Sequence, residues 1–259
     1  IRALFSASTG MYAQQMFVDT IANNLANANT TGFKKSRVDF QDILYQKMRP
    51  AGAENVAGSA IPSGIEVGLG VKPVSIAKIF TQGAIVKTDN PLDVAIEGDG
   101  FFQVALPDGT TAYTRDGAVK LDANGAFVNS DGLLYQPSIT VPAGTVELTI
   151  GQDGTVTALD NTGTATNIGQ LQLASFLNPV GLTSLGKNLY QETVASGTAT
   201  PGNPGDAGLG QLGQGFLEIS NIQLVEELVN LIMAQRAYEV NSKVIQASDQ
   251  MLQVANRLR

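Results

Sequence analysis

The C-terminal stretch Ser220–Arg259, SNIQLVEELVNLIMAQRAYEVNSKVIQASDQMLQVANRLR, carries the clearest structural signal of the chain. Neither Pro nor Gly occurs from Glu218 to the last residue. Apolar residues recur in it at intervals of four and three, which places them on one face of a helix. At about 1.5 Å per residue, such a helix is longer than an ordinary compact core can cover, so it requires a partner helix. The stripe consists of Met233, Ala237, Val240, Val244, Ala247, Met251, Val254 and Leu258.

The expected start of this helix carries two signals. Ser220 and Gln223 have the spacing of a capping box, and Glu226 and Glu227 suit the positive end of the helix dipole. We therefore expect the helix to begin close to Ser220.

The N-terminal stretch Ile1–Asn29 has a similar helical pattern, and Gly32 suits a left-handed cap after it. Only these two segments show the pattern, and a long stretch of different character separates them. Either both chain ends form a two-helix coiled coil, or neighbouring subunits complete one. The apolar residues of the first helix are Leu4, Ala7, Met11, Val18, Ile21, Leu25 and Ala28.

An Asn cluster interrupts the end of the first helix, although Asn is a mediocre helix former. Its members are either part of a frayed and solvated helix end, or amides that bond to a neighbouring helix or subunit and set the register. The cluster comprises Asn23, Asn24, Asn27 and Asn29.

The middle of the chain has the pattern of β structure. Short apolar or alternating runs are separated by Asp-Gly and Asn-Gly dipeptides, the strongest local hairpin signal. No helical period interrupts them, which favours a sandwich, barrel or other meandering β domain over a parallel sheet. The runs are Asp93–Ile96, Phe101–Leu106, Ala126–Val128, Val146–Ile150 and Leu171–Phe176, and the dipeptides begin at Asp108, Asp116, Asn124, Asp131 and Asp153.

Two Gly- and Pro-containing stretches, Arg49–Gly70 and Ala195–Gly215, are typical of linkers or extended loops. The sequence thus predicts an α+β fold, in which two long terminal α-helices form a coiled-coil-like domain and an all-β domain is inserted between them. We place the terminal helical domain at 1–35 and 217–259, a connecting segment at 36–75, and the β domain at 76–216.

The charge balance argues against nucleic acid as a partner. There are 16 basic and 23 acidic residues, a net charge of -7, whereas a nucleic-acid surface needs clustered basic residues. The short basic cluster of Lys34, Lys35 and Arg37 is interpreted as a solvated junction after the first helix. No apolar run reaches the length of a membrane span, and the N-terminal residues lack the pattern of a cleavable signal peptide.

The composition removes much catalytic chemistry. The chain has no His, Cys or Trp, so the commonest general base and the usual zinc and copper ligands are missing. Absence of Cys fits either a reducing compartment or a chain that crosses an oxidising one. Asp122–Gly125 and Ser130–Gly132 are candidates for a calcium loop, but the twelve-residue ligand pattern with its terminal bidentate Glu is absent. We expect no catalytic residue, no metal and no cofactor.

Carboxylates alone suffice for a glycosidase, so the acidic residues of the middle region are the remaining candidates for catalysis. Most of them lie in turn dipeptides, where Asp accepts local backbone hydrogen bonds, and no pair stands out. They are Asp89, Asp93, Glu97, Asp99, Asp108 and Asp116.

Three segments resemble the bacterial flagellar rod and hook family. The first is ANNLANANTTGFK at Ala22–Lys34, and the second is NPLDVAIEGDGFFQV at Asn90–Val104, followed by YTRDG at Tyr113–Gly117. The third combines SNI from Ser220, EELVN from Glu226 and QRAYEVNS from Gln235. Ala28 stands where Val is common in the family, and Ala118-Val119 where an aromatic residue is usual; Val119 still offers a buried β position.

Within the family, the chain resembles distal-rod members more than hook members, which usually carry an extra outer domain that 259 residues cannot hold. Tyr45–Ala53 and Ile61–Pro73 look like an insertion particular to distal-rod members. One alternative is another axial protein of the same family, from the hook or the proximal rod. An alternative from a different class is a secreted β-domain binding protein on a coiled-coil stalk, for which the glycan-binding Trp clusters are missing.

The resemblance implies a structural subunit, not an enzyme, that assembles with itself into a hollow helical tube and passes torque from the motor to the hook. It implies a place in the flagellar basal body, across the periplasm and outer membrane. The implied partners are proximal rod proteins, hook or hook-junction proteins, periplasmic and outer-membrane ring proteins, and the flagellar type III apparatus that exports the chain without a cleavable signal peptide. Phe40 and Leu44 fit a short aromatic-x-x-x-apolar export motif, and helix packing is an equally good account of them.

Terminal helices that cannot bury their stripes alone are expected to stay disordered until a neighbour arrives. A heterologous contact that does not close then generates a filament. The expected assembly interface is Leu4, Met11, Val18, Ile21, Leu25, Asn23, Asn24, Asn27, Met233, Val240, Val244, Met251, Val254 and Leu258.

Overall fold

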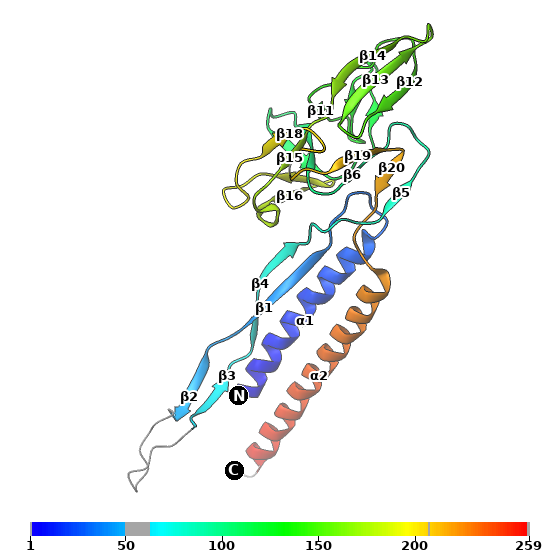
Figure 1. Cartoon of the computed structure of the whole chain (residues 1–259). Helices are drawn as coiled ribbons and strands as arrows, with labels where there is room; N and C mark the ends of the chain where they lie inside the picture. The colour runs from blue at the N-terminus through cyan, green and yellow to red at the C-terminus, as the bar shows by residue number, and fades with distance from the viewer. Residues whose placement is uncertain (1, 50–62, 207, 258–259) are drawn as a thin grey trace. The chain divides into compact units, whose positions relative to one another are not determined.

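The computed structural model describes residues 2–49, 63–206 and 208–257, without the side chain of residue 255 (Figure 1). It contains a helix near each end of the chain and a large β-rich part between them, which confirms the α+β class. The chain divides into two compact units. Unit 1 comprises Ile1–Ala26, Ser36–Ala77 and Gln223–Arg259, and unit 2 comprises Asn27–Lys35 and Lys78–Ile222.

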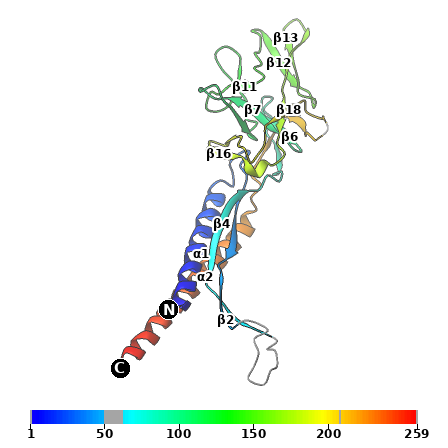
Figure 2. The ribbon, with the colours of Figure 1, turned by 90° about the vertical axis from the view of Figure 1, so that its left-hand side faces the viewer.

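Unit 1 is built on two antiparallel helices that lie side by side, α1 (Arg2–Ala26) and α2 (Leu224–Arg257) (Figures 1 and 2). Strand β1 (Ser36–Asp42) pairs with β4 (Val71–Lys78) and packs on α1. The chain continues into a second two-stranded ribbon, which has exposed residues along most of its length. This ribbon consists of β2 (Tyr45–Arg49) and β3 (Ile65–Gly68).

Both helices are shorter than their patterns predict. The first helix ends at Ala26, and the residues after it form turns. Gly32 has a φ of 66° but lies six residues beyond Ala26, so it is not the cap of this helix. A Cβ on Gly32 would lie 2.6 Å from the amide nitrogen of Asp116, so the glycine is needed for a close backbone approach. The second helix begins at Leu224, and the predicted capping box is wrong, because the Ser220 hydroxyl is buried without a hydrogen-bond partner among the described residues.

No helix in the part of the chain that the structure describes is long and apolar enough to cross a membrane.

Unit 2 contains short strands with antiparallel pairing, as the turn signals predict. Its largest sheet runs in the order β16-β17-β8-β7-β15-β18, with β11 also on β7, and a separate sheet runs β12-β13-β14. The strands are β5 (Ile85–Lys87), β6 (Val94–Glu97), β7 (Phe101–Ala105), β8 (Thr111–Thr114), β9 (Lys120–Leu121), β10 (Phe127–Val128), β11 (Tyr135–Gln136), β12 (Thr145–Ile150), β13 (Thr155–Asp160), β14 (Ala165–Gln170), β15 (Leu173–Ser175), β16 (Thr183–Gly186), β17 (Leu189–Gln191), β18 (Thr200–Gly202), β19 (Gln211–Gln214) and β20 (Phe216–Glu218), with a 3-10 turn at Pro179–Gly181.

Side chains from several sheets of unit 2 meet in its larger apolar core. Strands β6, β7 and β15 contribute its centre, as their apolar runs predict, and β19 adds Leu212. The other buried members are Val94, Ile96, Phe102, Val104, Val119, Phe127, Tyr135, Ile139, Ile150, Val156, Leu171 and Leu173.

Two expectations about the middle region need correction. Ala195–Gly215 is not a linker, because β18 and β19 of this stretch pair with β15 and β6. Most of the predicted turns place their Gly at positive φ, but Gly117 does not. A Cβ there would lie 1.6 Å from the carbonyl oxygen of Val94, so Gly117 permits a close approach and does not close a hairpin.

Candidate assembly interface

Small and polar residues lie on the face of α2 that contacts α1. Glu227 and Ala234 are buried, and together with Asn241 they recur every seven residues. A Cβ on Gly10 of α1 would lie 2.9 Å from Nδ2 of Asn241, so the glycine lets the two helices approach closely. At the other end of the contact, Nδ2 of Asn24 donates to Oε2 of Glu227 over 3.4 Å. The two helices therefore approach closely at Gly10 and Asn241 and are hydrogen-bonded at Asn24 and Glu227.

Asn24 also joins α1 to the start of β1. Its amide donates to the carbonyl of Ser36 and accepts from the amide nitrogen of Ser36, each over 2.9 Å. The two other Asn residues of the expected interface differ from it: Asn23 is exposed, and Asn27 belongs to unit 2, where its side chain accepts from the hydroxyl of Thr30.

The apolar stripe of α2 lies on a different face from the one that contacts α1. Each of its larger members is exposed in the isolated chain, and Leu258 lies outside the described residues. Hence the stripe does not form the contact between the two chain ends, and it remains available to a neighbour. The exposed members are Met233, Val240, Val244, Met251 and Val254.

The first turns of α2 are apolar over a wider arc. At about 100° per residue, the exposed side chains there spread over roughly half of the helix circumference. An apolar face that meets one neighbour spans about 100°, so a single partner helix cannot cover this arc. Two or more neighbouring elements are required. The residues are Leu224, Val225, Leu228, Val229, Ile232 and Met233.

The far end of α2 continues past α1. Because Gly10 lies opposite Asn241 in an antiparallel pair, the start of α1 at Arg2 lies opposite about residue 249. Met251 and Val254 belong to this extension, where α1 supplies no cover (Figure 1).

The predicted apolar residues of α1 are less accessible. Ile21 is buried, and the remaining four are half-buried within unit 1. These four are Leu4, Met11, Val18 and Leu25.

The two residues of the expected export motif lie on and directly after β1. Phe40 packs edge-on against Phe17 of α1, with 6.1 Å between ring centroids, and Leu44 is exposed before β2 begins.

A buried ion cluster lies in unit 2. Nζ of Lys34 is 2.6 Å from Oε1 of Glu218, and Nη1 of Arg115 is 3.4 Å from Oε2 of the same carboxylate. Lys34 also donates to the carbonyl of Thr81, and Glu218 accepts from the amide nitrogen of Gly83. Burial lowers the pKa of Lys34, and the Glu218 carboxylate opposes that shift. The expectation of a solvated basic junction is therefore wrong for Lys34.

The cluster joins the two ends of unit 2. Lys34 closes the first motif of the sequence, Arg115 lies in YTRDG, and Glu218 stands two residues before SNI. Motifs far apart in the chain thus meet at one carboxylate. Lys34 and Arg115 lie inside their motifs and Glu218 lies just before the third, and no local pattern shows that the three charges are buried together.

Four of the six acidic residues considered for catalysis, Asp89, Asp93, Asp108 and Asp116, have hydrogen-bond or ion-pair partners. Asp108 accepts from the amide and hydroxyl of Thr110, and Asp116 accepts from the hydroxyl of Thr31. The hydrogen bonds from Thr110 lower the pKa of Asp108. Among the described residues, no group of acidic side chains is arranged to hold a metal ion.

Three family descriptions match this chain in order. A description of flagellar basal body rod proteins matches residues 4–34, one of the D1 domain of the flagellar hook protein FlgE/F/G matches 95–158, and one of the C-terminal part of flagellar basal body rod FlgEFG proteins matches 214–258.

Full-length flagellar proteins are similar to this chain over all or nearly all of its length. The chain is 50% identical to the flagellar basal-body rod protein FlgG of Buchnera aphidicola subsp. Schizaphis graminum, over all of both chains. It is 42% identical to FlgG of Bacillus subtilis over 98% of this chain and 97% of the relative, and 31% identical to the flagellar hook-basal body complex protein FlhP of that organism over all of both. Among solved structures, the Helicobacter pylori flagellar hook protein FlgE2 matches 63% of this chain and 47% of its own at 17% identity, with a TM-score of 0.25, which is too low to carry an argument.

Proposed function

Since this chain belongs to the family of flagellar basal-body rod proteins, we propose that it polymerises with copies of itself into the distal rod of the flagellum. The family is structural, and the protein is not an enzyme. The observation that carries the proposal is the exposed apolar arc of α2, which one partner cannot cover. In a rod, several neighbouring helices contact each α2 and together cover this arc.

In this proposal α1 and α2 form a coiled-coil-like inner domain. The seven-residue spacing of Glu227, Ala234 and Asn241 supports pairing within the chain, and the stripe through Val240 and Val244 supports pairing between chains. Two different faces of one helix then serve two different contacts. The proposed contact between subunits uses the interface residues given above for the two terminal helices, except Ile21 and Asn24, which are buried within the chain.

We assign residues 1–35 and 217–259 to the inner tube, 36–75 to a connecting segment and 76–216 to the β domain. The connecting segment is the part that we propose to be particular to the distal rod. Its ribbon of β2 and β3 has exposed Tyr45, Met48 and Ile65, which suits burial against other subunits. Residues 50–62 of this segment lie outside the described residues.

The protein is proposed to transmit torque from the motor to the hook. In the rod it would meet proximal rod proteins, hook or hook-junction proteins and the rings of the periplasm and outer membrane. Export through the flagellar type III apparatus, with Phe40 and Leu44 as the motif, belongs to the same proposal. Exposure of Leu44 and the partial exposure of Phe40 are compatible with recognition before assembly.

Electron microscopy of the purified full chain tests the homopolymer directly. After long incubation at high concentration, we expect straight hollow rods whose length grows with time. Particles of one small, fixed size at every concentration would contradict the proposal. Expression of the chain in a strain that lacks its own distal rod subunit should restore swimming.

A further inference from the structure

All five methionine residues of the chain lie in unit 1, two of them on α1, one on β2 and two on α2. Because the chain has no Cys, His or Trp, their thioether sulfurs are the side-chain atoms that a peroxide oxidises most readily. Oxidation to the sulfoxide turns a flexible apolar side chain into a polar one. The residues are Met11, Met16, Met48, Met233 and Met251.

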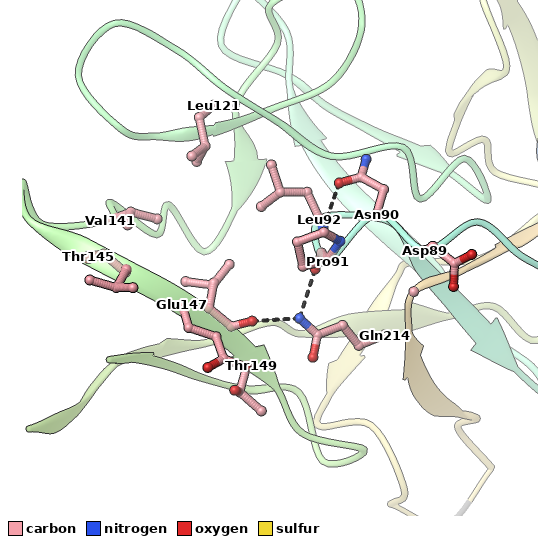
Figure 3. Close-up of a pocket in the computed structure, with 13 residues that line it drawn as sticks. Asp89, Asn90, Pro91, Leu92, Leu121, Val141, Thr145, Glu147, Thr149 and Gln214 are labelled. Atoms are coloured by element: carbon pink, nitrogen blue, oxygen red, sulfur yellow. Dashed lines mark hydrogen bonds between the residues drawn. The ribbon is translucent and has the colours of Figure 1, made fainter. Parts of the chain in front are cut away.

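Unit 2 contains no Met and therefore offers no such target. A groove of about 620 Å³ between β12 and the turn at Asp89–Leu92 has no sulfur in its lining (Figure 3). Nε2 of Gln214 joins its two walls by donating to the carbonyls of Pro91 and Leu148 over 2.8 and 2.7 Å (Figure 3). Peroxide is expected to leave these contacts unchanged, so the melting of unit 2 serves as an internal control.

The two methionines of α2 are accessible in the isolated chain. Met233 is 56% exposed in the apolar arc at the start of the helix, and Met251 is 65% exposed in the extension beyond α1. Met11 and Met16 of α1 are half-buried within unit 1. In the proposed rod, neighbouring helices cover the stripe that includes Met233 and Met251. Both sulfurs are thus open to a small oxidant before assembly and shielded from it afterwards.

A sulfoxide at either position would lie among apolar side chains of the same helix face. Arg236, the cation nearest to Met233 in the sequence, is paired with Glu239 over 3.0 Å. Burial of the new oxygen against a neighbouring subunit therefore leaves it without a hydrogen-bond partner, which opposes assembly. The side chains one turn before and one turn after the two methionines on this face are Val229, Ala237, Ala247 and Val254.

Met48 on β2 differs from these two residues, although it is 58% exposed. Nη1 of Arg2 donates to its Sδ over 3.4 Å. A thioether sulfur is a weak acceptor, so the same guanidinium can bond at least as well to the sulfoxide oxygen of an oxidised Met48. Oxidation of Met48 is therefore expected to oppose assembly less, and this residue is the matched control.

We propose that Met233 and Met251 are reversible oxidation sites that control the assembly of the free subunit. Hydrogen peroxide transfers one oxygen atom to the thioether sulfur: the O–O bond breaks, an S–O bond forms, and the peroxide leaves as water, reduced by the electron pair that sulfur gives up. The oxidised subunit stays folded but does not join the rod. A methionine sulfoxide reductase, with thiols as the reductant, restores the thioether and releases water. This inference rests on the proposed homopolymer and adds a chemical control to it.

Peroxide treatment of the full-length free chain tests the proposal. A dilute sample is treated with hydrogen peroxide, freed of it, and divided for peptide mass spectrometry, melting and pelleting. We expect one added oxygen at Met233 and at Met251 and an unchanged melting temperature of unit 2. The concentration needed for assembly should rise about tenfold or more, because an unpaired buried polar group opposes a contact by roughly that factor. Reductases for both sulfoxide stereoisomers should restore the original concentration.

Leucine variants identify the residues responsible, because Leu has nearly the volume of Met and is not oxidised. Each variant is compared with its own untreated sample. Peroxide should no longer impair the assembly of Met233→Leu/Met251→Leu, whereas Met48→Leu should remain as sensitive as the wild type. Rods treated after assembly should gain less oxygen at Met233 and Met251 than the free chain.

Three results would overturn the inference while the homopolymer stands. They are unimpaired assembly of a wild-type chain with sulfoxides at both positions, equal peroxide sensitivity of the double variant and the wild type, and equal oxidation of Met233 and Met251 in rods and in the free chain. If the untreated chain forms no rods at any concentration, both the inference and the proposed function are overturned.

Discussion

At the scale of single residues, the carboxylate of Glu218 is the most consequential side chain of unit 2. It is buried and pairs with two buried cations that lie 184 and 103 residues away in the sequence. Removing the one negative charge leaves both cations unpaired in the interior, whereas removing one cation leaves a balanced pair.

We therefore predict that Glu218→Gln lowers the free energy of unfolding of unit 2 by about 3–5 kcal/mol. Lys34→Met should cost clearly less, because Arg115 still faces Glu218. Urea unfolding of the full chain measures both. Asp89→Asn, which breaks an exposed pair with Lys87, is the surface control, with an expected loss of about 0–1 kcal/mol. Equal losses for Glu218→Gln and the control would show that the cluster does not stabilise unit 2.

Tyr113 makes the stability of unit 2 depend on alkaline pH. Burial, followed by the neighbouring Glu192 carboxylate, raises the pKa of Tyr113 to about 12. The group therefore stabilises the folded state fully below the unfolded pKa near 10, and this contribution is lost as pH rises from about 10 to 12.

Tyr113→Phe should reduce the loss of folding stability between pH 10 and 12. Melting of the wild type should fall more steeply than melting of the variant between pH 10 and 12, while the two differ little in this slope between pH 7 and 9. Parallel profiles over the whole range would contradict the raised pKa. Tyr135 and Tyr190, whose pKa values burial also raises, account for the loss that remains.

At the scale of elements, α2 has two faces that serve different contacts. The face with Glu227, Ala234 and Asn241 contacts α1, and the apolar stripe through Val240 and Val244 is exposed in the isolated chain. A charge on the apolar face should therefore leave the folded subunit intact and act only on the contact between subunits.

Val244→Asp tests this separation. Burial of an unpaired carboxylate in the subunit contact costs several kcal/mol, so rods should no longer form at concentrations at which the wild type assembles. Gln246→Asp, two residues away and exposed, is the matched control and should still assemble. Circular dichroism should show the same melting of unit 2 in both variants. A lower melting temperature for Val244→Asp alone would mean that this face of α2 belongs to the fold of the subunit.

At the scale of the whole molecule, the net charge is confined to one unit. Unit 1 has nine acidic and nine basic residues and is neutral, whereas unit 2 has fourteen acidic and seven basic residues and carries the whole net charge of -7. In a homopolymer the neutral helical units attract one another without a net charge penalty. The acidic β units repel one another unless salt screens them.

Assembly is consequently predicted to improve with salt. The Debye length falls from about 30 Å at 0.01 M to about 10 Å at 0.1 M ionic strength, so the repulsion between β units weakens over this range. The concentration of unassembled protein left after pelleting should fall as NaCl rises over the same range. A rise with salt would mean that opposite charges, not apolar contacts, hold the subunits together.

Features that depend on neighbours along the chain could be predicted from the sequence. The 4–3 spacing in Leu224–Arg257 and the lack of Pro and Gly specify a long helix, because helical contacts reach only three or four residues. Asn-Gly at Asn124 and Asp-Gly at Asp131 specify turns, because Gly accepts positive φ at little cost. The family motifs likewise identified a structural rod protein before any contact was known.

Which residues contact one another could be determined only from the tertiary structure. The heptad pattern showed an apolar stripe but not that α1 packs on a different face of the helix, because Gly10 and Asn241 allow an approach that apolar periodicity does not record. Burial of Lys34 depends on Glu218, whose position along the chain no local pattern relates to it. Periodicity is set by the helix itself, whereas burial and pairing are set by residues that folding brings together from far apart in the sequence.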